Sequence, residues 1–146
     1  CNYIRDQYPE KTVDVILDSI NSKYTFLKYS DTIIDEDAAR MAGLSDINYD
    51  LYFCLDCAEP ERLGFAEEFF DKAAFTICVD HHITNKGFGD LHFIHPENSS
   101  TCEILFSMMD TDKISLPCAE ALYAGIVHDI GVFKHNNTTR TTMETA

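Results

Sequence analysis

The stretch Thr76-Ile77-Cys78-Val79-Asp80-His81-His82 decides the fold of this chain. The apolar run Phe75–Val79 predicts a buried strand, which is followed at once by a carboxylate and two imidazoles. In an open α/β sheet, ligands bind beyond the carboxyl ends of the strands. Aspartate and histidine also hold divalent metal ions through oxygen and nitrogen. The sequence therefore predicts a ligand or metal site at the end of this strand.

A second strand and a helix precede this stretch. Residues 50–55 form an apolar run that ends at Asp56, and Pro60 stands where a helix accepts proline in its first turn. An apolar stripe at helical spacing continues that helix to about Lys72. A strand, a helix and a strand of these lengths predict a crossover, which makes the two strands parallel. Asp56 and Asp80 are then expected at the same edge of one sheet.

The remaining patterns complete an α/β fold. We expect a mostly parallel sheet flanked by helices on both faces, in one domain that spans residues 1–146. Further strands are predicted at 12–17, 32–34 and 91–94, and an extended piece at 132–135. Helical segments are predicted at 1–8, around 36–41, after 101, from 116 until Gly131 ends it, and at 140–145.

Net charge restricts the class of partner. The chain of 146 residues carries 11 basic and 25 acidic residues, a net charge of −14, without a basic cluster. This balance argues against binding of long nucleic acid, which needs a basic surface. A small phosphorylated ligand remains compatible with it, because bound metal ions supply positive charge locally.

Cysteine usage indicates a reducing compartment. Most of the six cysteines lie in or beside apolar segments, where a free thiol behaves as a small hydrophobe. The pair Cys54 and Cys57 is also compatible with half a zinc site or a redox pair, but no second pair accompanies it. We see no signal peptide, long apolar span or lipidation motif, and we expect a cytoplasmic protein that does not bind membranes.

A third group of chemically active residues lies near the end of the predicted helix from residue 116. Asp129 is three residues after Ile126, close to the apolar face, where an unpaired carboxylate would be expensive to desolvate. A metal ion or a cluster of donors removes that difficulty. Asp56, the 80–82 group and His128-Asp129 are therefore expected to converge. Such ligands suit Mn²⁺ or another first-row divalent ion, and two such ions can clamp a displacement at phosphorus.

Four stretches carry a resemblance to a known family. They are Asp56 after its strand, residues 79–85 (Val-Asp-His-His-Ile-Thr-Asn), residues 98–103 (Asn-Ser-Ser-Thr-Cys-Glu) and residues 121–139 around His128-Asp129. In order and spacing the chain resembles the DHH family of phosphoesterases. Within it, the chain is most similar to the bacterial nano-RNase group, which degrades very short oligoribonucleotides and dephosphorylates 3′-phosphoadenosine 5′-phosphate. Such a nucleotide is the expected substrate.

The resemblance implies roles for the acidic and imidazole side chains. Asp56 would bridge two metal ions, and His81 and Asp129 would complete the shell of the second. Asp80 would orient the imidazole of His81, and His82 would lie against the substrate phosphate. The implied cofactor is Mn²⁺ in a two-metal site of the full-length protein, with Mg²⁺ or Co²⁺ as alternatives.

The resemblance also implies substrate contacts from five polar residues. Ser99, Ser100 and Thr101 stand at a predicted helix N-terminus, whose donors suit a phosphate. Asn137 and Thr138 match the polar run that follows the last motif. These five residues are therefore expected to bind substrate or to support the site.

The chain departs from the family pattern at both ends. The first motif, a histidine with closely spaced aspartates, is expected just before Cys1, and a second, DHH-associated domain is expected after Ala146. Residues 1–146 alone would then hold an incomplete site with little or no activity. Ile130 also stands where the family more often has threonine.

Other functions stay open at this point. The string His128-Asp129-Ile130-Gly131 also occurs in the all-helical HD-domain phosphohydrolases. A cyclic-dinucleotide phosphodiesterase or an inorganic pyrophosphatase would share the metal-binding pattern. A regulatory domain that binds a nucleotide without cutting it would need no complete site. The oligomeric state is not readable from the sequence.

Overall fold

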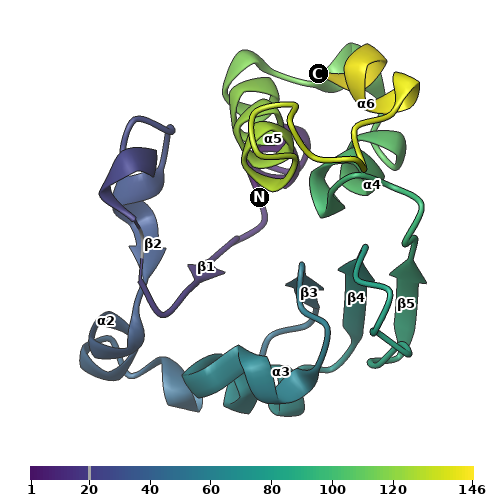
Figure 1. The fold of residues 1–146 in the computed structure, drawn as a ribbon. Helices are drawn as coiled ribbons and strands as arrows, with labels where there is room; N and C mark the ends of the chain where they lie inside the picture. The colour runs from purple at the N-terminus through teal and green to yellow at the C-terminus, as the bar shows by residue number, and fades with distance from the viewer. Residues whose placement is uncertain (20) are drawn as a thin grey trace.

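The computed structural model describes residues 1–19 and 21–146. Its central sheet contains three parallel strands in the order β3 (Tyr52–Leu55), β4 (Thr76–Asp80) and β5 (Leu91–Ile94). The register pairs Cys54 with Cys78. All three arrowheads in Figure 1 point toward helices α4 and α5. The predicted parallel α/β arrangement is confirmed, and Asp80 is the last residue of β4.

The crossover between β3 and β4 is broken into two helical pieces. A 3₁₀ segment, η4 (Pro60–Ala66), precedes helix α3 (Glu67–Lys72), and Gly64 inside η4 has φ 57° and ψ −131°. This left-handed conformation favours glycine, so the predicted single helix kinks at that residue. Phe69 on α3 is fully buried and packs with Ala39, Leu44 and Ala66.

Two short strands form a separate parallel sheet. They are β1 (Val15–Ile16) and β2 (Ile33–Ile34), and Ile16 and Ile34 pack against the cluster around Phe69. The predicted strand at 12–17 is shorter in the structure: the Val13 carbonyl accepts from the Arg5 guanidinium, not from a neighbouring strand, and the Asp14 carboxylate accepts from the Tyr49 hydroxyl. Figure 1 shows this sheet apart from β3–β5, so the expected single sheet is divided in two.

Short helical segments connect these strands. They are η1 (Ser22–Tyr24), η2 (Ser30–Thr32), α2 (Glu36–Met41) and η3 (Leu44–Asp46). The predicted helical turns around 36–41 are confirmed by α2, whose N-cap Asp35 accepts a hydrogen bond from the Ala38 backbone at 2.8 Å.

The other predicted helices are present. They are α1 (Asn2–Gln7), α4 (Thr101–Ser107), α5 (Leu116–Asp129) and α6 (Arg140–Thr145), with a 3₁₀ turn, η5 (Thr111–Lys113), between α4 and α5. Helix α4 packs against β4, α5 and α6, so it links the sheet to the C-terminal part of the chain. No helix in the described ranges combines the length and the apolar character that a membrane crossing requires.

The prediction of an extended piece at 132–135 is wrong. Gly131, Val132 and Phe133 have φ values of 54°, 59° and 61°, so the chain turns in a left-handed conformation. The Val132 amide donates to the Val127 carbonyl at 2.9 Å, and the Lys134 amide donates to the Ile130 carbonyl at 3.0 Å. These bonds fold the segment over the end of α5, where they satisfy carbonyls that the helix leaves free.

Thiol reactivity gives a first test of this fold. Cys1 is exposed, whereas Cys54, Cys57, Cys78 and Cys118 are buried. Burial, with the nearby carboxylates of Asp56 and Asp129, raises the pKa of the partly buried Cys102 to about 12. Because alkylation requires the thiolate, iodoacetamide at pH 8 is expected to modify Cys1 first and the other five only after denaturation, as peptide mass spectrometry would report. Rapid labelling of Cys102 in the folded protein would contradict the packing of α4.

Candidate metal centre

Asp56 directly follows β3 and has an unusual backbone conformation. Its φ is 58°, in the left-handed region that aspartate tolerates better than most residues. The Asp56 amide donates to the Val79 carbonyl at 3.0 Å, and its Oδ1 accepts a hydrogen bond from Thr101 Oγ1 at 2.8 Å. The carboxylate is thus fixed at the end of the sheet by the neighbouring strand and by the first residue of α4.

His81 lies between acceptors from three parts of the chain. Its Nε2 is 3.1 Å from Asp129 Oδ2 and 3.6 Å from Asp56 Oδ1. Its Nδ1 is 3.3 Å from the Asn98 carbonyl oxygen. The hydrogen bond to Asp129 raises the pKa of His81 above its ordinary value, against the opposing effect of burial. With Nδ1 facing a carbonyl, Nε2 is the nitrogen placed to bind a metal ion.

Asp80 contacts the second histidine, not the first. Its Oδ1 accepts a hydrogen bond from His82 Nδ1 at 2.7 Å, and its Oδ2 accepts one from Asn85 Nδ2 at 2.8 Å. The expected contact with His81 is therefore corrected: the Asn98 carbonyl holds His81, and Asp80 holds His82. Burial opposes ionisation of Asp80, but these hydrogen bonds outweigh it and leave its pKa below the ordinary value.

The last turn of α5 brings Asp129 to the site. Ile126 and Ile130 on either side of it are buried, and the Asp129 side chain is 29% exposed, beside His81. The convergence of Asp56, His81 and Asp129 that the sequence predicted is present in the structure. His128 is exposed, and its ring meets the ring of Tyr24 edge-on at 5.7 Å between centroids.

The donor atoms fit a divalent ion. Asp56, His81 and His82 each place one ligand atom within 4.8 Å of the others, and Asp129 reaches the same His81 nitrogen. Two atoms that each lie about 2.1 Å from one metal ion are about 3.0–3.4 Å apart at ordinary coordination angles. The separations of His81 Nε2 from the two carboxylates are close to this range. His82, which the sequence assigned to the substrate phosphate, lies farther out: its Nδ1 is 4.0 Å from Asp56 Oδ1 and is already bonded to Asp80.

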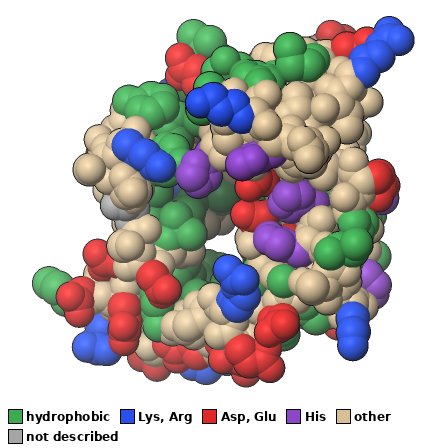
Figure 2. Space-filling view, in the orientation of Figure 1, with side chains coloured by type: hydrophobic (Ala, Val, Ile, Leu, Met, Phe, Trp, Pro, Cys, Tyr) green, Lys and Arg blue, Asp and Glu red, His purple; other side chains and the backbone are tan. Residues whose placement is uncertain are grey.

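The surface around these donor atoms also carries acidic and imidazole side chains. In Figure 2, histidine side chains lie next to acidic side chains in the middle of the face shown, with lysine or arginine side chains above and below this group. A chain with a net charge of −14 here concentrates acidic and imidazole groups where they can bind a cation.

The predicted substrate-binding residues differ in accessibility. Ser99 and Ser100 are 0% and 1% exposed, and their hydroxyls bond to Glu103: Ser99 Oγ donates to its carboxylate, and Ser100 Oγ accepts from its amide. In this arrangement neither hydroxyl is free to reach a substrate. Thr101 donates to Asp56 and is the member of this group that touches the candidate centre.

The two predicted residues that follow α5 are Asn137, which lies close to the turn of residues 98–101, and Thr138, which lies within the fold. Asn137 Nδ2 donates to the Ser99 carbonyl at 3.0 Å. The Thr138 hydroxyl is buried, and the described part of the chain gives it no hydrogen-bond partner. Asn137 thus supports the turn, and a substrate contact through either residue remains a prediction.

Three residues inside the quoted motif stretches were given no role by the sequence. Asn85 bonds Asp80, the Asn98 carbonyl faces His81, and Glu103 holds Ser99. A backbone carbonyl leaves no signal in a sequence. The spacing of Ser100 and Glu103, in contrast, is that of a capping box, and this pattern could have singled out Glu103.

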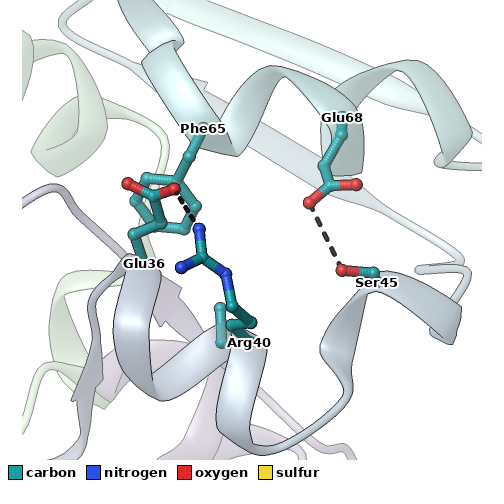
Figure 3. A pocket seen from close by; sticks show the side chains of 6 residues that line it. Glu36, Arg40, Ser45, Phe65 and Glu68 are labelled. Atoms are coloured by element: carbon teal, nitrogen blue, oxygen red, sulfur yellow. Dashed lines mark hydrogen bonds and ion pairs between the residues drawn. The ribbon is translucent and has the colours of Figure 1, made fainter.

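Two depressions on the surface lie apart from the candidate metal ligands. Figure 3 shows the smaller one, about 70 Å³, between α2 and the η4–α3 segment, where Arg40 pairs with Glu36 at 2.8 Å and Ser45 bonds Glu68. The larger, about 350 Å³, is bordered by residues 58–61 and 84–88. The larger one includes Asn85, so it adjoins the hydrogen bonds that hold Asp80.

Residues 4–126 match the DHH family, N-terminal domain. The chain belongs to the DHH family. The HD-domain alternative is wrong, since that fold is all-helical and His81 here follows a parallel strand.

Curated relatives of this DHH chain are bifunctional oligoribonuclease and PAP phosphatase NrnA proteins. The chain is 33% identical over 108 residues to the probable NrnA of Streptococcus mutans, covering 71% of this chain and 34% of that protein. It is 28% identical to NrnA of Bacillus subtilis, covering 98% of this chain and 44% of that protein. For NrnA of Thermus thermophilus the values are 36% identity, 58% and 26%.

A solved structure agrees with the fold. An exopolyphosphatase-related protein from Bacteroides fragilis superposes with a TM-score of 0.83 at 25% identity, covering 95% of this chain and 43% of that one. This DHH chain spans less than half the length of each of these relatives. The family and the fold are thus established for residues 1–146.

Proposed function

We propose that this DHH domain is part of a metal-dependent phosphoesterase that hydrolyses short oligoribonucleotides and 3′-phosphoadenosine 5′-phosphate. The observation that carries the proposal is the position of His81 Nε2, 3.1 Å and 3.6 Å from two carboxylates at the end of a parallel sheet. This arrangement suits a divalent cation and leaves the carboxylates partly open to solvent. The similarity to NrnA proteins supports the choice of substrate.

Each side chain has a distinct role in this proposal. Asp56, His81 and Asp129 would hold the metal, with Mn²⁺ as the expected ion and Mg²⁺ or Co²⁺ as alternatives. The bound ions would supply a hydroxide nucleophile at neutral pH and neutralise charge on the phosphate. The Asn98 carbonyl fixes the ring orientation of His81, so that Nε2 faces the two carboxylates.

The Asp80–His82 pair would act on the substrate side. Asp80 accepts the Nδ1–H of His82, which fixes the tautomer and leaves Nε2 for a metal ion or a phosphate oxygen. Asp80 is fully buried and itself held by Asn85, so the orientation of His82 is preset before substrate arrives. This rigidity suits a residue that must contact a phosphate at one position.

The direct test is an assay of the full-length protein. Purified, metal-stripped protein would be given Mn²⁺ and offered RNA from two to five nucleotides, 3′-phosphoadenosine 5′-phosphate, a linear and a cyclic dinucleotide, and pyrophosphate. We expect release of mononucleotide from dinucleotides and of phosphate from 3′-phosphoadenosine 5′-phosphate, and no release in the chelator control.

The same assay separates the alternatives. Turnover of the cyclic dinucleotide in preference to the short RNAs would assign a cyclic-dinucleotide phosphodiesterase, and turnover of pyrophosphate would assign a pyrophosphatase. Binding of a nucleotide without turnover of any substrate, at saturating Mn²⁺, would instead support a regulatory domain and would overturn the proposed activity.

A further inference from the structure

Glu103 is a buried carboxylate in the first turn of α4. Its side chain is 3% exposed, and Oε2 alone accepts three hydrogen bonds: from the Ser99 amide at 2.9 Å, from Ser99 Oγ at 2.5 Å and from Thr142 Oγ1 at 3.3 Å. A buried carboxylate is tolerated only where donors compensate for its lost hydration. Here the donors come from the turn before α4 and from α6.

These bonds hold one residue, Ser99, through all of its polar groups. Glu103 accepts from its amide and its hydroxyl, and Asn137 Nδ2 donates to its carbonyl at 3.0 Å. The adjacent Ser100 hydroxyl accepts from the Glu103 amide at 3.1 Å and caps α4. The turn 98–101 is therefore anchored from inside the fold.

Both ends of this turn contact candidate metal ligands. The Asn98 carbonyl, one residue before Ser99, accepts from His81 Nδ1 at 3.3 Å. The Thr101 hydroxyl, two residues after Ser99, donates to Asp56 Oδ1 at 2.8 Å. A small displacement of the turn would thus change the orientation of both ligands at once.

We propose that Glu103 is a positioning residue for the metal centre, acting through Ser99 to hold the Asn98 carbonyl on His81 and the Thr101 hydroxyl on Asp56. This inference rests on the proposed function for its effect on catalysis, but its effect on metal affinity and on the turn does not need a substrate. Groups that orient metal ligands without touching the metal commonly change metal affinity or activity by about 10-fold to 100-fold when lost.

The experiment uses variants that separate hydrogen bonding from charge and volume. Because one oxygen accepts all three bonds, the amide oxygen of Glu103→Gln can take its place, whereas Glu103→Leu keeps the approximate volume and removes every acceptor. Glu120→Gln and Glu120→Leu make the same changes at an exposed position on α5. All variants would be made in the full-length protein and compared well below their melting temperatures.

Three readouts decide the proposal: Mn²⁺ affinity by competitive titration, kcat and KM for a dinucleotide, and hydrogen exchange of the Ser99 amide by NMR. We expect E103L to weaken Mn²⁺ binding and to lower kcat by about 10-fold to 100-fold, with faster exchange at Ser99, and E103Q to stay within about threefold of the unchanged protein. Both Glu120 variants should match the unchanged protein.

The outcomes are distinguishable. If folded E103L keeps normal Mn²⁺ affinity and normal exchange at Ser99, the positioning role is wrong whatever the enzyme does. If E103L fails to fold, E103Q decides: a tenfold loss of Mn²⁺ affinity there would show that charge, not the bonded turn, matters. If the unchanged protein binds Mn²⁺ but hydrolyses nothing, the proposed function fails, while the titration and the exchange still test Glu103.

Discussion

Asp129→Asn is expected to reduce metal-dependent hydrolysis by at least about a hundredfold. Asp129 Oδ2 lies 3.1 Å from His81 Nε2, and asparagine keeps the size of the side chain but removes the negative charge that attracts a cation. Stabilisation of transition-state charge by a bound metal is worth several kcal/mol. At about 1.4 kcal/mol for each factor of ten, losing 3–4 kcal/mol corresponds to about a hundredfold to a thousandfold.

The measurement is kcat/KM of the full-length protein for a dinucleotide, across a range of Mn²⁺ concentrations. Weakened metal binding predicts that part of the loss is recovered at high Mn²⁺. Glu120→Gln is the matched control, since it makes the same chemical change on the same helix at an exposed position. Thermal unfolding of both variants should show that the fold is retained. An Asp129→Asn enzyme with at least half of the normal activity would remove Asp129 from the metal site.

The convergence of Asp56, His81 and Asp129 could be predicted from the sequence because it follows from topology. A strand–helix–strand pattern makes β3 and β4 parallel, and parallel strands bring their carboxyl ends to the same edge of the sheet. Asp129 could be included in the predicted site because a carboxylate beside a buried helix face requires groups that compensate for its lost hydration. None of these steps depends on the rotamer of a side chain.

The pairing of Asp80 could not be predicted in the same way. Two histidines follow Asp80, and which of them it contacts depends on how the chain turns at the end of β4. The Asn98 carbonyl occupies the Nδ1 side of His81, so Asp80 is left for His82. A backbone group from a distant loop decided this contact, and a sequence pattern does not indicate where such a group lies.

The accessibility of Ser99 and Ser100 illustrates the same limit. Serines before a helix are compatible both with phosphate binding and with capping, and local pattern does not separate the two. Glu103 decides between the two, because its buried carboxylate binds Ser99 inside the fold. It is itself bonded to Thr142 of α6, 39 residues away in the sequence. The left-handed turn at Val132 is likewise fixed by bonds to the end of α5, against the local preference of valine.

The second large effect is expected at the contact between α4 and α5. Gly125 lies one helical turn before Asp129, and a Cβ added at Gly125 would overlap Cys102 Sγ and lie 3.4 Å from Cys102 Cβ. Alanine in an exposed helix interior is about 1 kcal/mol better than glycine. Overpacking of a buried contact costs typically about 1–3 kcal/mol. Because neither helix can move without shifting Thr101 or Asp129, we expect the overpacking cost to exceed the gain from alanine, and Gly125→Ala to lower the free energy of unfolding by up to about 2 kcal/mol.

A double-mutant cycle with Cys102→Ala tests the reason for this loss. Removing Sγ leaves room for the new methyl group, so the double variant should be more stable than Gly125→Ala alone, with a coupling of about 1–3 kcal/mol between the two positions. Denaturant unfolding would supply the free energies, and Mn²⁺ affinity should fall in Gly125→Ala and recover in the double variant. If Gly125→Ala is instead more stable than the unchanged protein and shows no coupling to Cys102, the two helices do not pack closely enough to fix the site between them.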